Sequence, residues 1–297
     1  MERAYPYKVA IIGGDARQIE VARALGAQYQ EVRVFGHPPF ELPDSVRFVP
    51  EISQAINDAK IIVLPISGMD DSGMVRSYQA TELIDFGSCL PELSEDTLIV
   101  TGQMTSKWLK TAAEKRISVL QYADDDRIAI LNSIPTAEGA AQIAMEGLPI
   151  TIHGSVVLVI GFGRVGVTTA RVFKALGARV IVAARRQASL ARAYESNYET
   201  VLHRDLVNVI GSADLIINTV PALVLGKDEL AAVSPEALII DLASPPGGTD
   251  FAEAERLKLK AILAPGLPGK VAPKTAGKIL ASAIPEMIAD WIGGGGK

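Results

Sequence analysis

Two stretches of the chain repeat the same order of elements: an apolar strand, a glycine turn, a helical pattern and a second apolar strand. The first is YKVAIIGGDARQIEVARALGAQYQEVRVFG (residues 7–36), and the second is SVVLVIGFGRVGVTTARVFKALGARVIVAAR (residues 155–185). Apolar runs that alternate with helical patterns are typical of parallel strands joined by helices. The repeat therefore predicts an α/β protein with two doubly wound, Rossmann-like parallel sheets.

Further apolar runs in each half extend the two predicted sheets. We predict a flavodoxin- or Rossmann-like substrate domain over residues 1–134 and a nucleotide-binding Rossmann domain over residues 135–270, with a cleft between them. A last helix, expected within residues 271–293, should pack back on the first domain and complete it. The apolar runs lie at residues 61–67, 97–102, 117–122, 214–220, 237–244 and 260–265.

The segment NSIPTAEGAAQIAMEGLPITIHG (residues 132–154) separates the two halves. Proline is favoured at the first position of a helix, and Thr136 and Glu138 follow Pro135 as residues typical of a first turn. We therefore expect a helix that begins near Pro135 and leads into the second domain.

Length and composition set limits on the class of protein. The chain has 297 residues, 48% of them hydrophobic, and a formal net charge of −5 without a basic cluster, so a nucleic-acid partner is not expected. The single cysteine, Cys89, cannot form a disulfide within the chain, which fits a reducing compartment. The apolar runs are shorter than a membrane span and the start lacks a signal-peptide pattern, so we expect a cytoplasmic protein. No cluster of side chains has the spacing of metal ligands, and no metal site is expected.

The motif GFGRVG (residues 161–166) lies between a predicted strand and a predicted helix, which is the context of a dinucleotide site. Gly161 would allow the tight turn, Gly163 would let the backbone approach a pyrophosphate, and Gly166 would let the helix pack close to the strand. The amides from Phe162 to Val165 would receive the anion at the helix start. A Rossmann-like domain that keeps these glycines only for packing is the alternative.

About twenty residues after this motif, an NAD site usually has an acidic residue, but this chain has Ala183, Ala184, Arg185 and Arg186. Small residues leave room there, and two arginines can pair with a 2′-phosphate, while Ser189 can add a hydroxyl. NADP is therefore favoured over NAD; two solvated surface arginines are the alternative.

Ligands of such sheets lie at the carboxyl ends of the strands, which adds NTVP (218–221) and DLAS (241–244) to the expected cofactor site. Asp241 can equally cap the turn that follows it. The complete predicted cofactor set is Gly161, Phe162, Gly163, Arg164, Val165, Gly166, Arg185, Arg186, Ser189, Thr219, Val220, Pro221, Asp241, Ala243 and Ser244.

The first glycine turn, GGDARQ (residues 13–18), lacks the spacing of a dinucleotide motif, so a second dinucleotide site is not expected. Asp15 and Arg17 nonetheless follow the first strand, where Arg17 can anchor a substrate carboxylate. A surface arginine at a helix start is the alternative reading.

Several longer motifs together resemble the A-subunit family of the dipicolinate synthases of spore-forming bacteria. They are VAIIGGDARQIE, NSIPTAEG, GFGRVG, DLASPPGGTDF and APGLPGKVAPKTAGKIL, and they span nearly the whole chain. The resemblance implies an NAD(P)-dependent enzyme that acts with a smaller, flavoprotein-like B subunit in the mother cell. It also implies the reaction, the oxidation of dihydrodipicolinate, a lysine-pathway intermediate, to dipicolinic acid.

A ring dicarboxylate calls for cations, and we expect Arg17, Lys270 and Lys274, with both lysines in a loop after APGLPG. Glu138 is the candidate proton acceptor, with helix capping as its alternative, and Thr136 and Lys274 complete the candidate catalytic set. Ser67 at the end of a strand is a further candidate substrate contact. Each lysine can also be an ordinary surface residue.

Two other functions stay open on the sequence alone. The chain can be a non-catalytic NADP-binding partner of a synthase complex, or an NADP dehydrogenase for another amino-acid-derived substrate. A 2-hydroxyacid dehydrogenase is disfavoured because no histidine follows His203 to serve as the acid–base group. Self-association of the chain also stays open.

Overall fold

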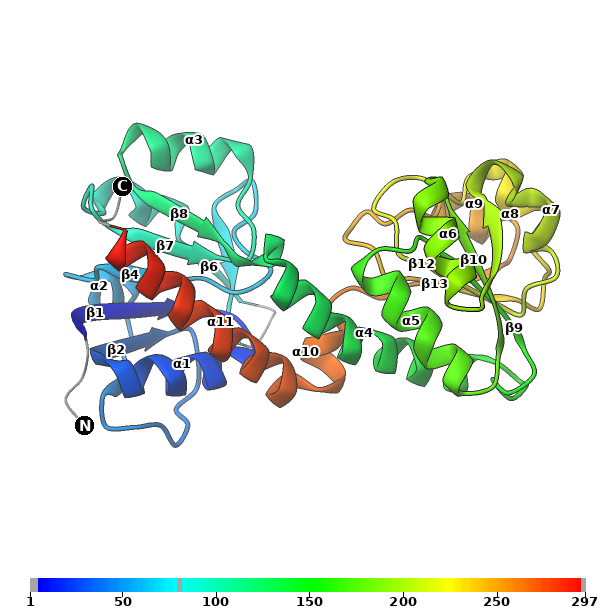
Figure 1. Ribbon diagram of the computed structural model, residues 1–297. Coiled ribbons are helices and arrows are strands. Elements are labelled where there is room, and N and C mark those ends of the chain that lie inside the picture. The colour runs from blue at the N-terminus through cyan, green and yellow to red at the C-terminus, as the bar shows by residue number, and fades with distance from the viewer. Residues whose placement is uncertain (1–4, 79–81, 295–297) are drawn as a thin grey trace. The chain divides into compact units, whose positions relative to one another are not determined.

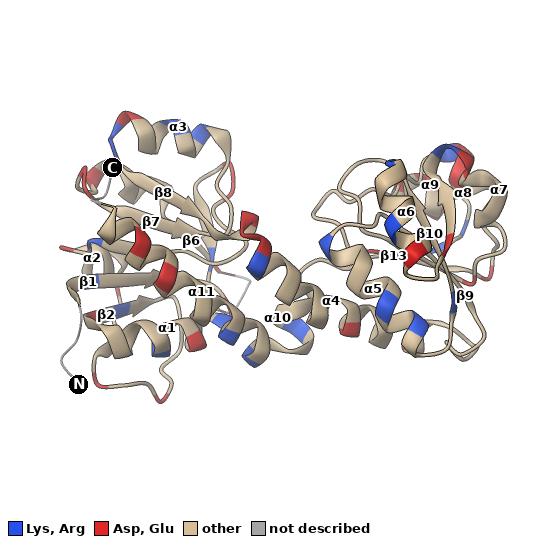
Figure 2. Ribbon diagram, in the orientation of Figure 1, with Lys and Arg blue, Asp and Glu red and all other residues tan. Residues whose placement is uncertain are grey.

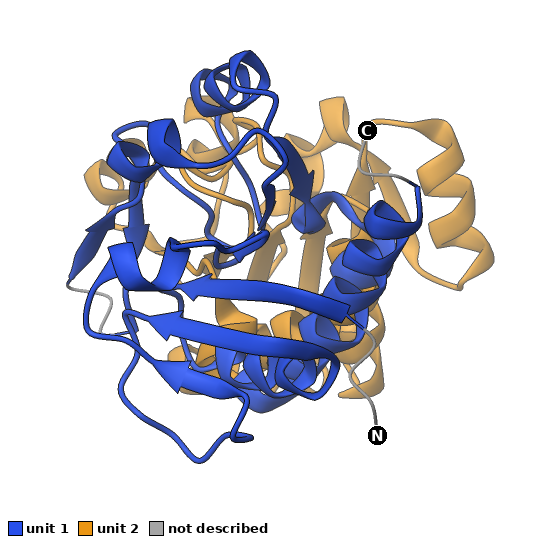
Figure 3. Ribbon diagram, turned by 90° about the vertical axis from the view of Figure 1, so that its left-hand side faces the viewer, with its two compact units in different colours: residues 1–129, 272–297 blue, residues 130–271 orange. Residues whose placement is uncertain are grey.

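The computed structural model describes residues 5–78 and 82–294. The chain divides into two compact units, residues 1–129 with 272–297 and residues 130–271 (Figures 1 and 3). Each unit contains a six-stranded parallel sheet with helices packed against it. The prediction of two Rossmann-like parallel sheets is confirmed.

The first unit contains helices from both ends of the chain. Its helices are α1 (Arg17–Gln28), α2 (Ile52–Ile56), α3 (Ser106–Glu114) and α11 (Pro273–Gly293). A small antiparallel hairpin of β5 (Met74–Arg76) and β6 (Leu83–Asp85) lies outside the main sheet. The main strands are β1 (Tyr5–Ile12), β2 (Tyr29–Phe35), β3 (Val46–Phe48), β4 (Ile61–Val63), β7 (Leu98–Thr101) and β8 (Ser118–Gln121), in the spatial order β3-β2-β1-β4-β7-β8.

The second unit repeats this order of strands. Its helices are α5 (Arg164–Ala175), α6 (Gln187–Glu195), α7 (Val207–Ile210), α8 (Lys227–Ala231), α9 (Phe251–Arg256) and α10 (Leu267–Val271). Its strands are β9 (Val156–Ile160), β10 (Arg179–Ala184), β11 (Glu199–Leu202), β12 (Leu215–Asn218), β13 (Leu238–Asp241) and β14 (Lys260–Leu263), in the order β11-β10-β9-β12-β13-β14.

Each sheet has an apolar core on both faces. Along β1, Val9 and Ile11 enter the core that contains α1 and α11, whereas Ala10 and Ile12 enter the core on the opposite face. Strand β9 divides its side chains in the same way between two cores. This pattern explains why the strands read as continuous apolar runs, while the charged residues gather on the helices (Figure 2).

The strand order reverses direction at one point in each sheet. In the first sheet this point lies between β1 and β4, and in the second between β9 and β12. A ligand of an open parallel sheet binds outside the carboxyl ends of the strands at such a point. The fold therefore offers one ligand position in each unit.

The helix expected to begin near Pro135 begins earlier, which corrects that prediction. Helix α4 (Asp126–Gly147) starts in the first unit, continues into the second and contains Pro135 in its interior. Asp125 precedes it, and its Oδ1 accepts a hydrogen bond from the amide of Ile128 at 2.9 Å, as a capping residue does. Pro135 removes one backbone donor, which a helix of 22 residues tolerates.

Candidate functional site

The three motif glycines of the second unit have different surroundings. Gly161 adopts a φ of +95°, and a Cβ there would lie 2.4 Å from Oγ1 of Thr219. At Gly166 a Cβ would lie 2.1 Å from the carbonyl oxygen of Gly161, so only glycine lets α5 pack on the turn. Around Gly163, by contrast, no atom lies within 4 Å of a Cβ position. Its backbone is open to a ligand.

This difference predicts separable effects of two alanine substitutions. Gly163→Ala should leave the thermal unfolding temperature unchanged and weaken dinucleotide binding about tenfold, because the methyl group enters only the open space. Gly166→Ala should reduce the free energy of unfolding by about 1–3 kcal/mol, since the methyl group meets a backbone oxygen. Calorimetry and a dinucleotide titration on both variants check the pair, and a destabilised Gly163→Ala variant would contradict it.

The start of α5 supplies the amides that face this open space. Gly163 precedes the helix, and the amides of Val165 and Gly166 belong to its first turn, where a helix has no internal acceptors. Arg164 is exposed at the first position of the helix. The ring of Phe162 packs edge-on against Tyr198, with centroids 5.8 Å apart, so this residue offers its backbone rather than its side chain.

The carboxyl end of β10 lies beside this turn, because the amide of Gly161 donates to the carbonyl oxygen of Ala183. Ala183 and Ala184 are buried, and Arg185 and Arg186 are exposed. Among the residues that the structure describes, neither guanidinium has a carboxylate partner. Arg186 immediately precedes α6, and Ser189 lies in the first turn of that helix. Two arginines, a hydroxyl and a helix start are thus grouped where sequence reasoning expects them.

Two polar side chains at the ends of β12 and β13 order the neighbouring loops. Asn218 and Asp241 pair in the sheet register, and both are fully buried. The Nδ2 group of Asn218 donates to Oδ1 of Asp241 at 2.9 Å and to the carbonyl oxygen of Val220 at 3.0 Å. Asn218 lies in the motif NTVP expected at the cofactor site, but it is absent from the residues predicted individually, although a polar residue that ends the buried run LIIN is a usable signal.

Asp241 accepts hydrogen bonds at both carboxylate oxygens. Its Oδ1 receives the amide of Ala243 at 3.0 Å, and its Oδ2 receives the amide of Gly248 at 2.8 Å and the hydroxyl of Thr249 at 2.7 Å. Protein donors therefore account for both oxygens, and the side chain orders the loop that follows β13. This favours the structural reading of Asp241. Ala243 is buried and Ser244 is exposed in that loop.

The remaining predicted cofactor residues follow β12. Oγ1 of Thr219 donates to the carbonyl oxygen of Ile160 at 2.9 Å and so ties this loop to the end of β9. Val220 is half-buried and Pro221 is exposed. The loop therefore lies beside the glycine turn, at the reversal point of the second sheet.

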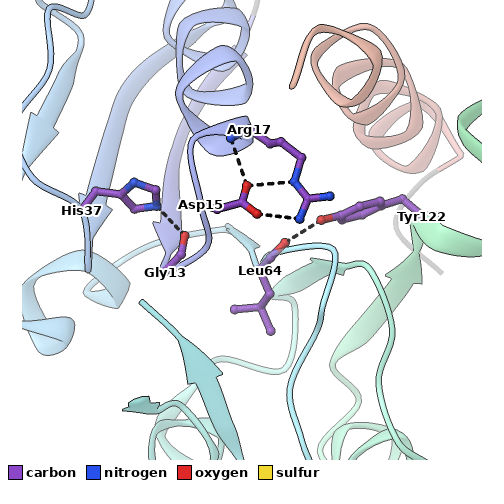
Figure 4. A network of polar contacts seen from close by, with 6 residues as sticks. All are labelled: Gly13, Asp15, Arg17, His37, Leu64 and Tyr122. Atoms are coloured by element: carbon purple, nitrogen blue, oxygen red, sulfur yellow. Dashed lines mark hydrogen bonds and ion pairs between the residues drawn. The ribbon is translucent and has the colours of Figure 1, made fainter. Parts of the chain in front are cut away.

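In the first unit, Asp15 and Arg17 form an ion pair at the end of β1 (Figure 4). Nε and Nη2 of Arg17 donate to the Asp15 carboxylate at 2.8 and 2.6 Å, and the amide of Arg17 donates to the same group. Burial raises the pKa of Asp15, but the hydrogen bonds and charge of Arg17 outweigh it and hold the pKa below its ordinary value. Nearby, the hydroxyl of the buried Tyr122 donates to the carbonyl oxygen of Leu64 at 3.0 Å.

The glycine turn of the first unit is closed by the hairpin β5–β6. The amide of Gly13 donates to the carbonyl oxygen of Phe35, and the amide of Gly14 donates to that of Arg76 in β5. A Cβ on Gly13 would lie 2.4 Å from the Arg76 oxygen. The amides of Gly13 and Gly14 are therefore used within the protein.

His37 follows β2 and is bonded to the same turn, with Nε2 placed 2.6 Å from the carbonyl oxygen of Gly13 (Figure 4). Because that oxygen can only accept, Nε2 carries the proton. Burial lowers the pKa of His37, and the hydrogen bond to Gly13 and the charge of Asp15 only partly oppose the shift.

The lowered pKa predicts an acid sensitivity of the first unit. As pH falls through the ordinary histidine value of 6.5, the unfolded chain takes up a proton before the folded unit does, so the free energy of unfolding decreases. His37→Gln keeps a donor for Gly13 but does not titrate, and it should lose less stability between pH 7.5 and 5.5. Urea unfolding followed by tryptophan fluorescence reports on this unit, because it holds both Trp108 and Trp291. The exposed His153 supplies the control His153→Gln, and equal losses in all three proteins would contradict the prediction.

Four of the other predicted residues lie elsewhere than expected. Ser67 is exposed in a turn beyond the end of β4. Lys270 lies in α10 and Lys274 in the first turn of α11, so the two lysines do not share a loop; proline after Ala272 begins a new helix instead. Thr136 lies inside α4, where its hydroxyl donates to the carbonyl oxygen of Asn132 at 2.7 Å.

Glu138 is exposed on α4 rather than at a helix start, so it does not cap the helix. It lines a shallow groove of about 480 Å³ together with Met145, Val172 and Leu176. Val172 follows Gly163 by nine residues, about 13 Å along α5. Glu138 therefore lines a groove beside the last turns of α5 and not beside the glycine turn.

The described residues contain neither a metal-binding cluster nor a helix suited to span a membrane. Within residues 5–78 and 82–294, no group of three or more His, Cys, Asp or Glu side chains could hold a metal ion. No helix in this part of the chain has the length and apolar character of a membrane span.

Comparisons with known proteins relate both units to described families. Residues 8–123 match the family of N-terminal domains of the dipicolinate synthase A subunit. Residues 136–245 match the NAD-binding domain of the D-isomer-specific 2-hydroxyacid dehydrogenases. The second match covers the glycine turn and the end of β10, and it indicates a nicotinamide cofactor.

Individual relatives match over nearly the whole length. The dipicolinate synthase A subunit of Bacillus subtilis (strain 168) is 39% identical over 287 residues, which cover 95% of this chain and 96% of that protein. The crystal structure of the dipicolinate synthase A subunit from Bacillus halodurans superposes with a TM-score of 0.90 at 38% identity, over 96% of this chain and 99% of that one. An L-alanine dehydrogenase shares the fold, with a TM-score of 0.65 at 13% identity over 96% of this chain and 90% of that one.

Proposed function

The chain belongs to the dipicolinate synthase A-subunit family, and from this premise we propose that it is an NADP-dependent oxidoreductase that converts dihydrodipicolinate into dipicolinate. Its NAD-binding domain supports the broader statement, a nicotinamide-dependent oxidoreductase. The observation that carries the choice of NADP is the carboxyl end of β10, where two exposed arginines stand in place of an acidic residue.

The residues around that strand end suit a 2′-phosphate. Arg185 and Arg186 can form charge-assisted hydrogen bonds with its oxygens, and Ser189 and the start of α6 add neutral donors. A carboxylate at this position would instead accept from the ribose hydroxyls and repel the phosphate. We therefore assign these three side chains to the 2′-phosphate.

The glycine turn suits the pyrophosphate of the same cofactor. Gly163 leaves open space, and the first turn of α5 presents amides toward it. Thr219 and the loop after β12 form the adjacent wall. When bound, the oxidised nicotinamide accepts one hydride from the substrate.

The overall reaction removes a hydride and a proton from the dihydropyridine ring and leaves an aromatic pyridine-2,6-dicarboxylate. Because aromatisation favours this direction, the protein has to position the ring and give the proton an acceptor, rather than activate an unreactive bond. The hydroxyl of Thr136 donates to the carbonyl oxygen of Asn132 and, as a neutral alcohol, is a poor proton acceptor. Glu138 can accept a proton, but it lies far along α5 from the glycine turn. The exposed Lys274 is better suited to binding a carboxylate.

The experiment that tests the proposal is anaerobic turnover of freshly generated dihydrodipicolinate with NADP⁺. Pyridine-dicarboxylate absorbance and NADPH absorbance are followed together, first with this chain and then with the flavoprotein-like B subunit that the family implies. Stoichiometric growth of both signals with the chain alone would support it as the catalyst.

Two other outcomes would favour the alternatives. If NADP⁺ binds but turnover requires the B subunit, the chain shares the active site or has a non-catalytic role. If neither protein combination oxidises dihydrodipicolinate, a panel of amino-acid-derived substrates would identify another dehydrogenase activity.

A further inference from the structure

The first sheet has a ligand position of its own, at the reversal point between β1 and β4. Gly14 follows β1 there, and Pro65 follows β4. A Cβ on Gly14 would lie 2.6 Å from Cγ of Gln18 and 3.0 Å from Cβ of Pro65, so Gln18 lies across Gly14 beside the end of β4. Gln18 and Arg17 in the first turn of α1 thus both belong to this position.

Gln18 is 3% exposed, and neither Nε2 nor Oε1 has a hydrogen-bond partner in the described part of the chain. A buried carboxamide without partners is unfavourable, and such groups in native proteins have a reason to persist. A helical side chain points back toward the start of its helix, which directs this carboxamide toward the glycine turn. A ligand that binds beside it would supply the missing partner.

Asp15 fixes the orientation of the Arg17 guanidinium. Its side chain is 11% exposed, and Nε and Nη2 are fixed by Asp15, whereas Nη1 has no acceptor among the described residues. The guanidinium is planar, so fixing one edge also fixes the direction of the other N–H groups. Asp15 therefore acts as a positioning residue for Arg17.

The charge balance indicates the chemical class of the ligand. Asp15 and Arg17 carry no net charge together, so the position offers directed donors rather than an excess of positive charge. The amides of Gly13 and Gly14 donate to Phe35 and Arg76, and those of Arg17 and Gln18 donate to Asp15. A phosphate dianion would therefore find few free backbone donors and no net positive charge, whereas a single carboxylate can accept from the free donors of the two side chains.

We propose that Arg17 Nη1 and Gln18 Nε2 bind one carboxylate group of a small dicarboxylate substrate at the reversal point of the first sheet. This assignment rests on the proposed function, which makes the substrate a pyridine-type dicarboxylate. Arg17 is thus a substrate-binding residue, as its sequence position suggests. Gln18 is added because its buried carboxamide has no hydrogen-bond partner in the described part of the chain, which the sequence does not reveal.

The test is calorimetric titration of the full chain with pyridine-2,6-dicarboxylate in metal-free buffer, without cofactor. Arg17→Lys keeps the charge but loses the planar guanidinium, and we expect its affinity to fall about tenfold or more. Gln18→Met keeps the length of the side chain without the carboxamide, and its affinity should fall about fivefold. Arg23→Lys, on the same helix in the exposed pair with Glu20, is the matched control and should bind like the wild type.

Thermal unfolding separates binding from structure. Gln18→Met removes an unsatisfied buried group, so its unfolding temperature should rise while its affinity falls. Unchanged affinity in Gln18→Met and Arg17→Lys, or no binding of the dicarboxylate by the wild type, would overturn the proposal. If the wild type oxidises dihydrodipicolinate but both variants bind pyridine-2,6-dicarboxylate as tightly as the wild type, the proposed site is wrong and the proposed function stands. If both variants bind the dicarboxylate more weakly but the wild type does not oxidise dihydrodipicolinate, the proposed site stands and the proposed function is wrong.

Discussion

The double substitution Arg185→Asp with Arg186→Ala should invert the cofactor preference of the chain. We expect its affinity for NADPH to fall about 100-fold, or about 2.7 kcal/mol, because two charge-assisted contacts disappear and a carboxylate faces the 2′-phosphate. Affinity for NADH should stay within about threefold of the wild type or improve, since the introduced carboxylate can accept from the ribose hydroxyls. Fluorescence titrations with both reduced cofactors measure the two affinities.

Helix α6, which follows Arg186, supplies the control for this experiment. Arg192 in α6 is exposed and pairs with Glu195 at 3.3 Å, so Arg192→Ala removes a positive charge without touching the strand end. It should leave the ratio of the two affinities unchanged. In the wild type, the preference for NADPH should also decrease with ionic strength, because salt screens exposed charges. Equal losses of NADPH and NADH affinity in the double variant would show that the 2′-phosphate lies elsewhere.

The sequence carries most of the information on the second unit because its site is made by backbone geometry. Gly161, Gly163 and Gly166 each have a distinct steric reason, and a fixed spacing after a strand is enough to reveal them. The arginines after β10 are visible for the same reason, since the strand end is defined by the apolar run before it. The positive φ of Gly161 and the close approach of Gly166 to the Gly161 carbonyl oxygen both arise within the motif itself.

Long-range contacts are where the sequence interpretation fails. Asp241 has the position and the side-chain chemistry expected of a ligand contact. Its actual partners, Asn218, Gly248 and Thr249, come together around it only in the folded unit. In the first unit, closure of the glycine turn depends on the hairpin β5–β6, whose three-residue strands show little periodicity. The early start of α4 at Asp126 depends on capping by Asp125, whereas Pro135 is a stronger local signal.

The two units share the same strand order, but their glycine turns have different surroundings. At the reversal point of the second sheet the turn is open, with no atom within 4 Å of the Cβ position of Gly163. At the reversal point of the first sheet the amides of Gly13 and Gly14 are engaged, and the side chains of Arg17 and Gln18 offer free donors. Backbone donors at a helix start suit a phosphate, and oriented side chains suit a carboxylate. One topology thus supports a nucleotide position and, by our proposal, a substrate position.

The substitution Asp241→Asn should cause the largest loss of stability, and it should do so in the second unit alone. The carboxylate accepts from Asn218, Ala243, Gly248 and Thr249, and an amide nitrogen in place of either oxygen would face at least one N–H donor. Leaving such donors buried and unpaired costs about 3–5 kcal/mol in total, which corresponds to a fall of roughly 10 °C in the unfolding temperature of that unit.

Two probes distinguish the units in this experiment. Both tryptophans lie in the first unit, so tryptophan fluorescence follows that unit, while far-ultraviolet circular dichroism follows both. In Asp241→Asn we expect the second unit to unfold at a lower temperature by circular dichroism, with a much smaller change in fluorescence. The conservative control is Asp250→Asn: Asp250 caps α9 by accepting from the amide of Glu253, and an asparagine cap retains that bond. If Asp241→Asn unfolds like the wild type but loses dinucleotide affinity, Asp241 is a cofactor contact and not the group that orders the loop.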